Sequence, residues 1–239
     1  MNEPPMPPKV SGTFWAGGGK RAFDLLAGVV LLVLLSPLML LAAAVVKLTS
    51  RGPVFFRQDR GGKDGAIFRP FKFRTMRAGR TPDPKELVPL EHADITPVGR
   101  LLRRVKIDEL PQLFNVLSGD MSLVGPRPTL PDQVAAYDDF RRQRLLVRPG
   151  VTGLAQVYSS AEVSWDERIL YDIAYVRGCS LWLDLVVLLR TIAVVIAGEA
   201  RTQKPFSETH YTRYVAPPPD FGSFTARGIW ERPEDEKRR

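Results

Sequence analysis

The chain has 239 residues, enough for one domain with a sizeable hydrophobic core. Its formal net charge of +8 suits an anionic partner: a nucleic acid, an anionic membrane surface or a phosphorylated substrate. A single cysteine, Cys179, excludes an internal disulfide framework and a cysteine-rich zinc site, and the presence of only two histidines argues against a histidine-based metal site. Because the sequence carries no zinc-finger, RNA-binding or Walker-type motif, it favours a membrane surface or a phosphorylated ligand over nucleic acid.

An uncharged run extends from Leu25 to Val46, 22 residues that are long enough to cross a bilayer as a helix. Pro37, near its middle, removes the backbone hydrogen bond to Val33, and the hydroxyl of Ser36 can satisfy the freed carbonyl. Basic residues flank the run on both sides, and positive charge prefers the cytoplasmic side of a membrane. Two alternatives follow: a re-entrant helix over residues 20–48 that breaks at Ser36-Pro37, or a spanning helix with a proline kink.

Residues 52–76 predict a β-hairpin whose turn is the glycine-rich segment 61–65. Phenylalanines stand beside arginines and lysine along both strands, as expected of a surface at the level of lipid headgroups. A core strand with solvated charges is the alternative.

Two adjacent carboxylates, Asp108 and Glu109, begin a helix-period pattern that continues to Leu117. Asp108 fits a helix N-cap and Pro111 fits the first turn, so the pair would lie at the positive end of a helix. Basic residues precede the pair and a rigid loop with Arg127 follows it. Acids among bases indicate a site for a phosphorylated ligand, together with a divalent metal; helix capping alone is the alternative.

A helix is expected over residues 132–147, and the arginines on it, Arg141, Arg142 and Arg144, indicate a solvated or membrane-facing side. A second rigid loop with an arginine, Arg148-Pro149-Gly150, comes directly after it.

An apolar segment over residues 181–197 contains Asp184 and Arg190, which make a second membrane span costly. An amphipathic helix in the membrane interface and a buried core helix are the alternatives. The ends of the chain are rich in proline or lack hydrophobic periodicity, and predict a disordered tail over residues 1–19 and a mostly disordered tail over residues 201–239.

Several motifs occur in a fixed order along the chain. They are Ser36-Pro37, Gly52–Gln58, Lys72–Met76, Asp108–Leu113, Gly119–Ser122, Gly125–Pro128 and Arg148–Gly153. This ordered set resembles the bacterial sugar transferases known as monotopic polyprenyl-phosphate phosphoglycosyl transferases, over residues 18–198. The resemblance is to the minimal form, without the N-terminal multi-span region of larger members.

The resemblance implies an enzyme that transfers a sugar phosphate from a nucleotide-sugar, usually a UDP-sugar, to polyprenyl (undecaprenyl) phosphate, with release of UMP. It implies Mg²⁺ and a covalent phosphosugar intermediate on Asp108. Asp108 and Glu109 would be the catalytic and metal-binding residues, with Glu109 either a metal ligand or an orienting group. Basic and acidic positions expected to bind substrate are Lys72, Arg103, Arg127, Arg148 and Asp172. The reaction would be the first membrane step of bacterial glycoconjugate or exopolysaccharide synthesis.

We therefore expect an α+β fold, mainly α, at the cytosolic face of the bacterial cytoplasmic membrane. Residues 20–48 would form the re-entrant helix, and residues 49–200 a catalytic domain with the small hairpin and interfacial amphipathic helices. Two rival hypotheses remain. A membrane-anchored basic scaffold that binds anionic lipid or acidic partners would release no nucleotide, and a retaining or inverting glycosyltransferase would release UDP instead of UMP.

Overall fold

The structure is a computed structural model that describes residues 15–77, 90–159, 164–197, 204–215, 223–224 and 230–231. It divides into two compact units. The dyad unit, which contains Asp108 and Glu109, comprises Arg21–Leu123 and Pro128–Ala135. The helical unit comprises Met1–Lys20, Val124–Arg127 and Ala136–Arg239.

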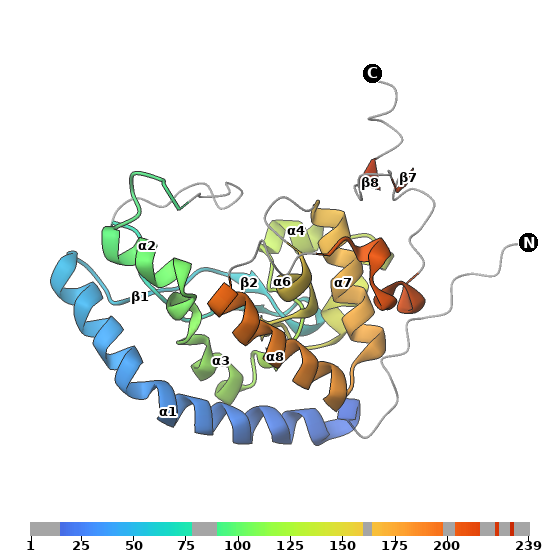
Figure 1. The fold of residues 1–239 in the computed structure, drawn as a ribbon, viewed down its shortest axis with the longest axis horizontal. Helices are drawn as coiled ribbons and strands as arrows, with labels where there is room; N and C mark the ends of the chain where they lie inside the picture. The colour runs from blue at the N-terminus through green and yellow to red at the C-terminus, as the bar shows by residue number, and fades with distance from the viewer. Residues whose placement is uncertain are drawn as a thin grey trace, which may run out of the picture. The chain divides into compact units, whose positions relative to one another are not determined.

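The long apolar segment forms helix α1 (Lys20–Thr49), which bends near its middle (Figure 1). Pro37 lies inside the helix, and the Ser36 hydroxyl donates a hydrogen bond of 2.8 Å to the carbonyl of Val33. This carbonyl is the one that Pro37 leaves without its backbone donor, so the expected role of Ser36 is confirmed. Among the described residues, α1 is the one helix long and apolar enough to cross a membrane.

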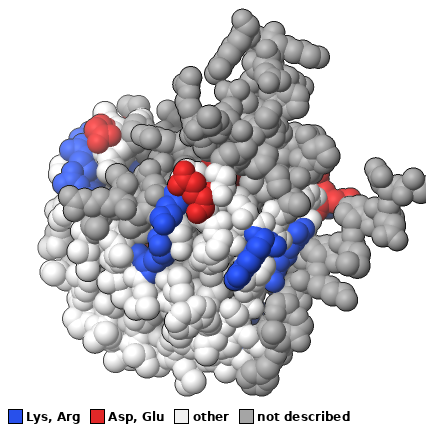
Figure 2. All heavy atoms as spheres, turned by 45° about the vertical axis from the view of Figure 1, so that its right-hand side comes forward, with Lys and Arg blue, Asp and Glu red and all other residues white. Residues whose placement is uncertain are grey.

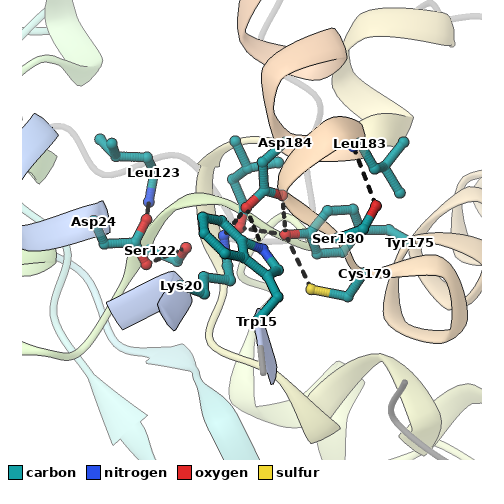
Figure 3. Close-up of polar contacts among 11 residues, drawn as sticks. Trp15, Lys20, Asp24, Ser122, Leu123, Tyr175, Cys179, Ser180, Leu183 and Asp184 are labelled. Atoms are coloured by element: carbon teal, nitrogen blue, oxygen red, sulfur yellow. Dashed lines mark hydrogen bonds and ion pairs between the residues drawn. The ribbon is translucent and has the colours of Figure 1, made fainter. Parts of the chain in front are cut away.

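The N-terminal limb of α1 is held by charged side chains. Arg21 donates to the carbonyls of Val116 and Leu117, at 2.6 and 3.0 Å, where the last turn of a helix leaves carbonyls unpaired. Asp24, buried one turn further on, accepts from the Ser122 hydroxyl at 2.8 Å and from the Leu123 N–H at 3.0 Å (Figure 3).

The C-terminal limb of α1 is held by apolar packing. Met39, Ala42 and Val46 are buried in one cluster with Phe73 and Leu102. Many other apolar side chains of α1 are exposed, among them Leu26, Val30, Val33, Leu34, Leu40 and Leu41. The lower part of the surface drawn in Figure 2, where α1 runs in Figure 1, is largely uncharged.

The predicted hairpin is present as two short antiparallel ladders. β1 (Phe55–Phe56) pairs with β4 (Lys72–Phe73), and β2 (Arg60–Gly61) pairs with β3 (Ile67–Phe68) around the turn Lys63–Gly65. The register places Phe55 opposite Phe73, and these two rings stack.

The rest of the dyad unit is mainly helical. Its helical elements are α2 (Pro97–Arg104), the 3₁₀ turn η3 (Ile107–Glu109), α3 (Gln112–Ser118) and α4 (Pro131–Ala135). Strand β5 (Ser122–Val124) follows α3 and ends in Val124, the first residue of the helical unit after the dyad unit's Leu123. Thr96 caps α2 by accepting from the N–H of Gly99, and Gly119 ends α3 in the left-handed conformation.

The helical unit is built around α7 (Trp165–Gly178), in which every residue from Ile169 to Val176 is buried. Around it lie α5 (Asp139–Arg142), η4 (Gln143–Leu146), β6 (Gly150–Thr152), α6 (Leu154–Tyr158) and α8 (Leu181–Ala197), preceded in sequence by η1 (Trp15–Gly19). The single helix expected over residues 132–147 is wrong: α4, α5 and η4 replace it, and Asp138 caps α5 at the break.

The helix α8 buries one side and exposes another. Leu183 and Val187 are buried, whereas Leu189, Ile192 and Ile196 are exposed and Trp182 is 75% exposed. Asp184 is fully buried and accepts hydrogen bonds from Trp15, Lys20 and Tyr175 (Figure 3). Asp184, which made a second membrane span costly, is therefore an internal hydrogen-bond acceptor. Helix α8 combines a core face with an exposed apolar face.

Part of the expected C-terminal tail is folded. Residues 204–215 form η6 (Phe206–Glu208) and η7 (His210–Tyr214), with Phe206, Tyr211 and Val215 buried. The expected tail boundary at residue 201 is therefore too early for this segment, because its aromatic side chains fill the core beside α7. Strands β7 (Ser223–Phe224) and β8 (Trp230–Glu231) pair with each other further on. Residues 1–14 and the rest of the tail lie outside the described residues.

Candidate active site

The backbone between α2 and α3 presents the two carboxylates. Lys106 adopts a left-handed conformation, φ 58° and ψ 16°, which ends α2 and starts the turn η3. Such a conformation is uncommon for a residue other than glycine and costs about 1–2 kcal/mol, so the surrounding fold must hold it. Asp108 and Glu109 are the second and third residues of that turn.

Asp108 does not act as an N-cap. The residue before α3 is Pro111, and neither η3 nor α3 has a side-chain cap. Among the described residues no hydrogen bond reaches the Asp108 carboxylate, although it is only 9% exposed. The expectation of a cap is wrong here, and capping alone does not explain this pair of acids.

Opposing effects act on the pKa of the Asp108 carboxyl group. Burial and the neighbouring Glu109 raise the pKa of its carboxyl group, while Lys72, Arg103 and Lys106 lower it. A carboxylate with little hydration and no hydrogen bond is a better nucleophile or metal ligand than a fully solvated one, provided that the cations keep it ionised.

Two cations from different elements frame the pair. Lys72, on β4, forms an ion pair of 2.6 Å with Glu109. Arg103, in the last turn of α2, donates its Nε–H to the Thr75 hydroxyl at 2.9 Å. Burial lowers the pKa of Arg103, and the carboxylates of Asp108 and Glu109 raise it. The structure thus brings together Lys72, Arg103, Asp108 and Glu109 of the expected site residues.

One supporting residue was missed from the sequence. Asn115, on α3 and buried, accepts from the N–H of Phe71 at 2.8 Å and donates to the carbonyl of Arg69 at 3.2 Å. These bonds fix the chain that leads into β4, and so fix Lys72. The signal was present as a single amide inside an apolar helix pattern, but its partners are 44 and 46 positions away.

The other expected residues lie in the helical unit. Arg127 is exposed and Arg148 half-exposed, on two loops whose backbones are bonded together. The N–H of Gly150 donates to the carbonyl of Pro126 at 2.9 Å, and a Cβ on Gly125 would lie 2.4 Å from the carbonyl of Arg148. Only glycine permits this approach, so the two arginine loops form one rigid piece.

Asp172 is connected to these two loops from the interior of the helical unit. Its carboxylate is buried and forms an ion pair with Arg144, which is also buried. Arg144 also donates to the carbonyl of Arg127 at 2.9 Å and to the hydroxyl of Tyr137 at 2.6 Å. Burial raises the pKa of Asp172 to about 6, against the lowering effect of Arg144. Asp172 therefore reaches the Arg127 loop through Arg144, and the expected solvated or membrane-facing side is wrong for Arg144.

An ionisable carboxylate pair framed by lysine and arginine, next to a long apolar helix, defines a class of protein: a membrane-associated enzyme that acts on anionic, phosphorylated substrates. The sequence matches the bacterial sugar transferase family over residues 15–198. The chain belongs to this family.

Relatives in several bacteria share the matched region. The chain is 44% identical to the uncharacterized sugar transferase EpsL of Bacillus subtilis over 184 residues, 77% of this chain and 90% of EpsL. It is 45% identical to the UDP-glucose:undecaprenyl-phosphate glucose-1-phosphate transferase of Caulobacter vibrioides over 194 residues, 75% of this chain and 70% of that protein. It is 42% identical to the UDP-N-acetylgalactosamine-undecaprenyl-phosphate N-acetylgalactosaminephosphotransferase of Aeromonas hydrophila, but spans only 44% of that protein's length.

Proposed function

We propose that this chain transfers a sugar phosphate from a UDP-sugar to undecaprenyl phosphate, as a step in bacterial exopolysaccharide or glycoconjugate synthesis. The names of the relatives in Caulobacter and Aeromonas support the reaction, and that of the exopolysaccharide production protein ExoY of Rhizobium meliloti, 39% identical, supports the setting. The observation that carries the chemistry is the pair Asp108–Glu109 between Lys72 and Arg103.

The released nucleotide tests this function. Purified protein in detergent, given undecaprenyl phosphate and either UDP-glucose, UDP-galactose or UDP-N-acetylgalactosamine, should release UMP with at least one of them. Release of UDP would instead indicate glycosyl transfer at the sugar carbon. Release of neither nucleotide from a wider panel of UDP-sugars would favour the membrane-anchored scaffold.

The reaction divides into two displacements at phosphorus. A carboxylate oxygen of Asp108 forms a bond to the β-phosphorus of the UDP-sugar, the bond to the bridging oxygen breaks, and UMP leaves with both electrons of that bond. The phosphate of undecaprenyl phosphate then attacks the same phosphorus and releases Asp108. Lys72 and Arg103 offset the negative charge that would otherwise repel the carboxylate.

Mg²⁺ fits this site by its donor set. Mg²⁺ is usually bound through one or two carboxylates together with phosphate oxygens of the substrate, and Asp108 and Glu109 supply two carboxylates. In the described part of the chain there is no group of three or more side chains that could hold a metal by itself. Bound Mg²⁺ would supply positive charge at the diphosphate.

Removal of divalent metal should therefore stop turnover without unfolding the protein. We expect EDTA to reduce UMP release to background, and excess Mg²⁺ to restore it. The thermal melting temperature with and without EDTA is the control, because a two-carboxylate site contributes little to the fold. Full activity in EDTA would remove Mg²⁺ from the proposal.

The contacts of α1 support a re-entrant topology. Arg21 and Asp24 bond the N-terminal limb to the dyad unit, and Met39 and Val46 bury the C-terminal limb in the same unit. A unit that carries so many charged groups does not cross a bilayer. Both ends of α1 would then lie on one side of the membrane, the cytosolic side, with the bend at Ser36-Pro37 inside the lipid. The exposed apolar face of α8 would rest in the interface.

This topology predicts that Ser11 and Thr225, both outside the described residues, face the cytoplasm. Single cysteines at these positions, in a Cys179→Ser background, should resist a membrane-impermeant thiol reagent in intact cells and react after lysis. Replacing Ser36 by Ala and Pro37 by Leu restores the backbone donor and should straighten α1, so that position 11 becomes accessible from outside. Labelling at position 11 in the unmodified helix would establish a spanning segment.

The arginine loops should bind phosphate groups. We expect Arg127→Ala and Arg148→Ala each to lower turnover roughly ten- to a hundred-fold, the value of a hydrogen bond to a charged group that is realised in the transition state. Arg213→Ala, an exposed arginine of the same unit, is the control and should have normal kinetics. Normal turnover in both loop variants, with unchanged melting temperature, would make these arginines ordinary surface residues.

A further inference from the structure

The segment directly after β4 also contacts the site. Lys72, on β4, pairs with Glu109, and Thr75, two residues after β4, bonds to Arg103. The Thr75 hydroxyl oxygen, buried, accepts the Nε–H of Arg103 at 2.9 Å. Within the described residues, Nε is the one guanidinium nitrogen of Arg103 with a hydrogen-bond partner. A guanidinium group is planar, so a bond at Nε restricts its plane and leaves its terminal N–H groups available to a ligand.

Thr75 is itself held tightly against α2. Its carbonyl accepts from the N–H of Thr96 at 3.0 Å and from the Thr96 hydroxyl at 3.3 Å. A Cβ on Gly99, in the first turn of α2, would lie 2.0 Å from the same carbonyl, so only glycine allows this contact. The helix that carries Arg103 is thus fastened to Thr75 at its N-terminus through the backbone and at its C-terminus through the hydroxyl.

We propose that Thr75 is a positioning residue that holds the Arg103 guanidinium beside the carboxylate pair, ready for the diphosphate of the nucleotide-sugar. Arg103 is close enough to Asp108 and Glu109 for their charges to act on it, so a change in its orientation changes the positive charge at the point of attack. The inference rests on the proposed function for the identity of the anion. The argument that Thr75 orients Arg103 rests on the hydrogen bond between them and does not depend on that function.

The test is a double-mutant cycle on Thr75 and Arg103. Thr75→Val keeps the shape and loses the acceptor, Thr75→Ser keeps the acceptor, and Arg103→Met removes the cation. Thr212→Val, which removes a hydroxyl that donates to the nearby carbonyl of Thr209 at 3.1 Å, is the matched control. Kinetics of UMP release are measured with the UDP-sugar that the unmodified protein uses, and UDP affinity is measured by calorimetry as a readout that needs no turnover.

We expect Thr75→Val to lower kcat/KM about ten-fold, Thr75→Ser to restore most of this loss, and Thr212→Val to have no effect. The double variant Thr75→Val/Arg103→Met should be no slower than Arg103→Met alone, because Thr75 acts through the arginine. UDP affinity should follow the same pattern. Thr75→Ala provides the same comparison if the valine variant fails to fold.

Three results would overturn the inference. The two single effects could multiply in the double variant, serine could be as slow as valine, or Thr75→Val could be normal while Arg103→Met is slow. Each leaves the transferase assignment intact. If the unmodified protein releases no UMP, the proposed function fails. Where it still binds UDP, the cycle in UDP affinity decides the role of Thr75, and a protein that binds no UDP overturns this inference as well.

Discussion

Replacing Asp108 by asparagine should abolish both the covalent adduct and the burst of UMP, and lower turnover roughly a thousand-fold or more. In the unmodified enzyme, Mg²⁺ and a UDP-sugar without undecaprenyl phosphate should release at most one UMP per active site. The protein should gain the mass of one sugar phosphate on the peptide that contains Asp108, and undecaprenyl phosphate should discharge it. Asparagine keeps the size of the side chain and removes the charge that attacks.

The burst should also depend on pH in a definite direction. Only the ionised carboxylate attacks, so the rate is full above the pKa of Asp108 and is lost as the pH falls through it. Because burial raises that pKa, the acidic limb should lie above the ordinary range of an aspartate. A limb at or below that range would mean that the positive charges near Asp108, the side-chain cations together with Mg²⁺, outweigh burial.

Glu109→Gln is the companion variant. It should be slow, because its carboxylate pairs with Lys72 and supplies a second acid to the site. It should nevertheless form the adduct, since Asp108 remains. If Asp108→Asn still formed an adduct, Glu109 would be the next nucleophile to test. If no adduct could be trapped and both substrates were needed before UMP appeared, direct transfer would replace the two-step scheme.

Much of the local structure could be predicted because it depends on neighbours in sequence. The turn glycines set the hairpin. Pro37 and Ser36 set the bend of α1, and the hydrogen bond involved joins residues only three positions apart. The anchoring of α1 could not be predicted in this way. Asp24 finds its partners 98 and 99 positions further along the chain, and nothing near it in sequence separates a buried acceptor from a membrane-flanking charge.

The site shows the same division. Asp108 and Glu109 are adjacent in sequence, so their pairing was visible, whereas the ion pair of Glu109 with Lys72 joins residues 37 positions apart. The burial of Arg144 could not be predicted, because its neighbours in sequence are also arginines. It follows Arg141 and Arg142 in a basic run that suggests solvent exposure, yet the break of the expected helix at Asp138 turns Arg144 inward to Asp172.

The Arg144–Asp172 pair should be the most stability-sensitive contact of the helical unit. Both side chains are 2% exposed, and removing one partner of such a pair leaves an uncompensated buried charge. Above the pKa of Asp172, we expect Asp172→Ala and Arg144→Met each to lower the free energy of unfolding by about 3–5 kcal/mol, measured by chemical denaturation in detergent. The double variant Asp172→Leu/Arg144→Met should be more stable than either single variant, because neither charge is then buried alone. Arg69→Met, which breaks a surface pair with Asp59, should change stability little and serves as the control.

The pH dependence separates the two single variants. In Arg144→Met the buried carboxyl group of Asp172 can take up a proton, and its pKa, already about 6 beside Arg144, rises further without it. A group whose pKa is raised in the folded state stabilises the fold when protonated, so the penalty of Arg144→Met should be small at pH 5 and grow as the pH rises through that pKa. Asp172→Ala leaves a guanidinium that keeps its charge, so its penalty should stay nearly constant over the same range. Equal pH dependence in the two variants would show that Asp172 is not the titrating group.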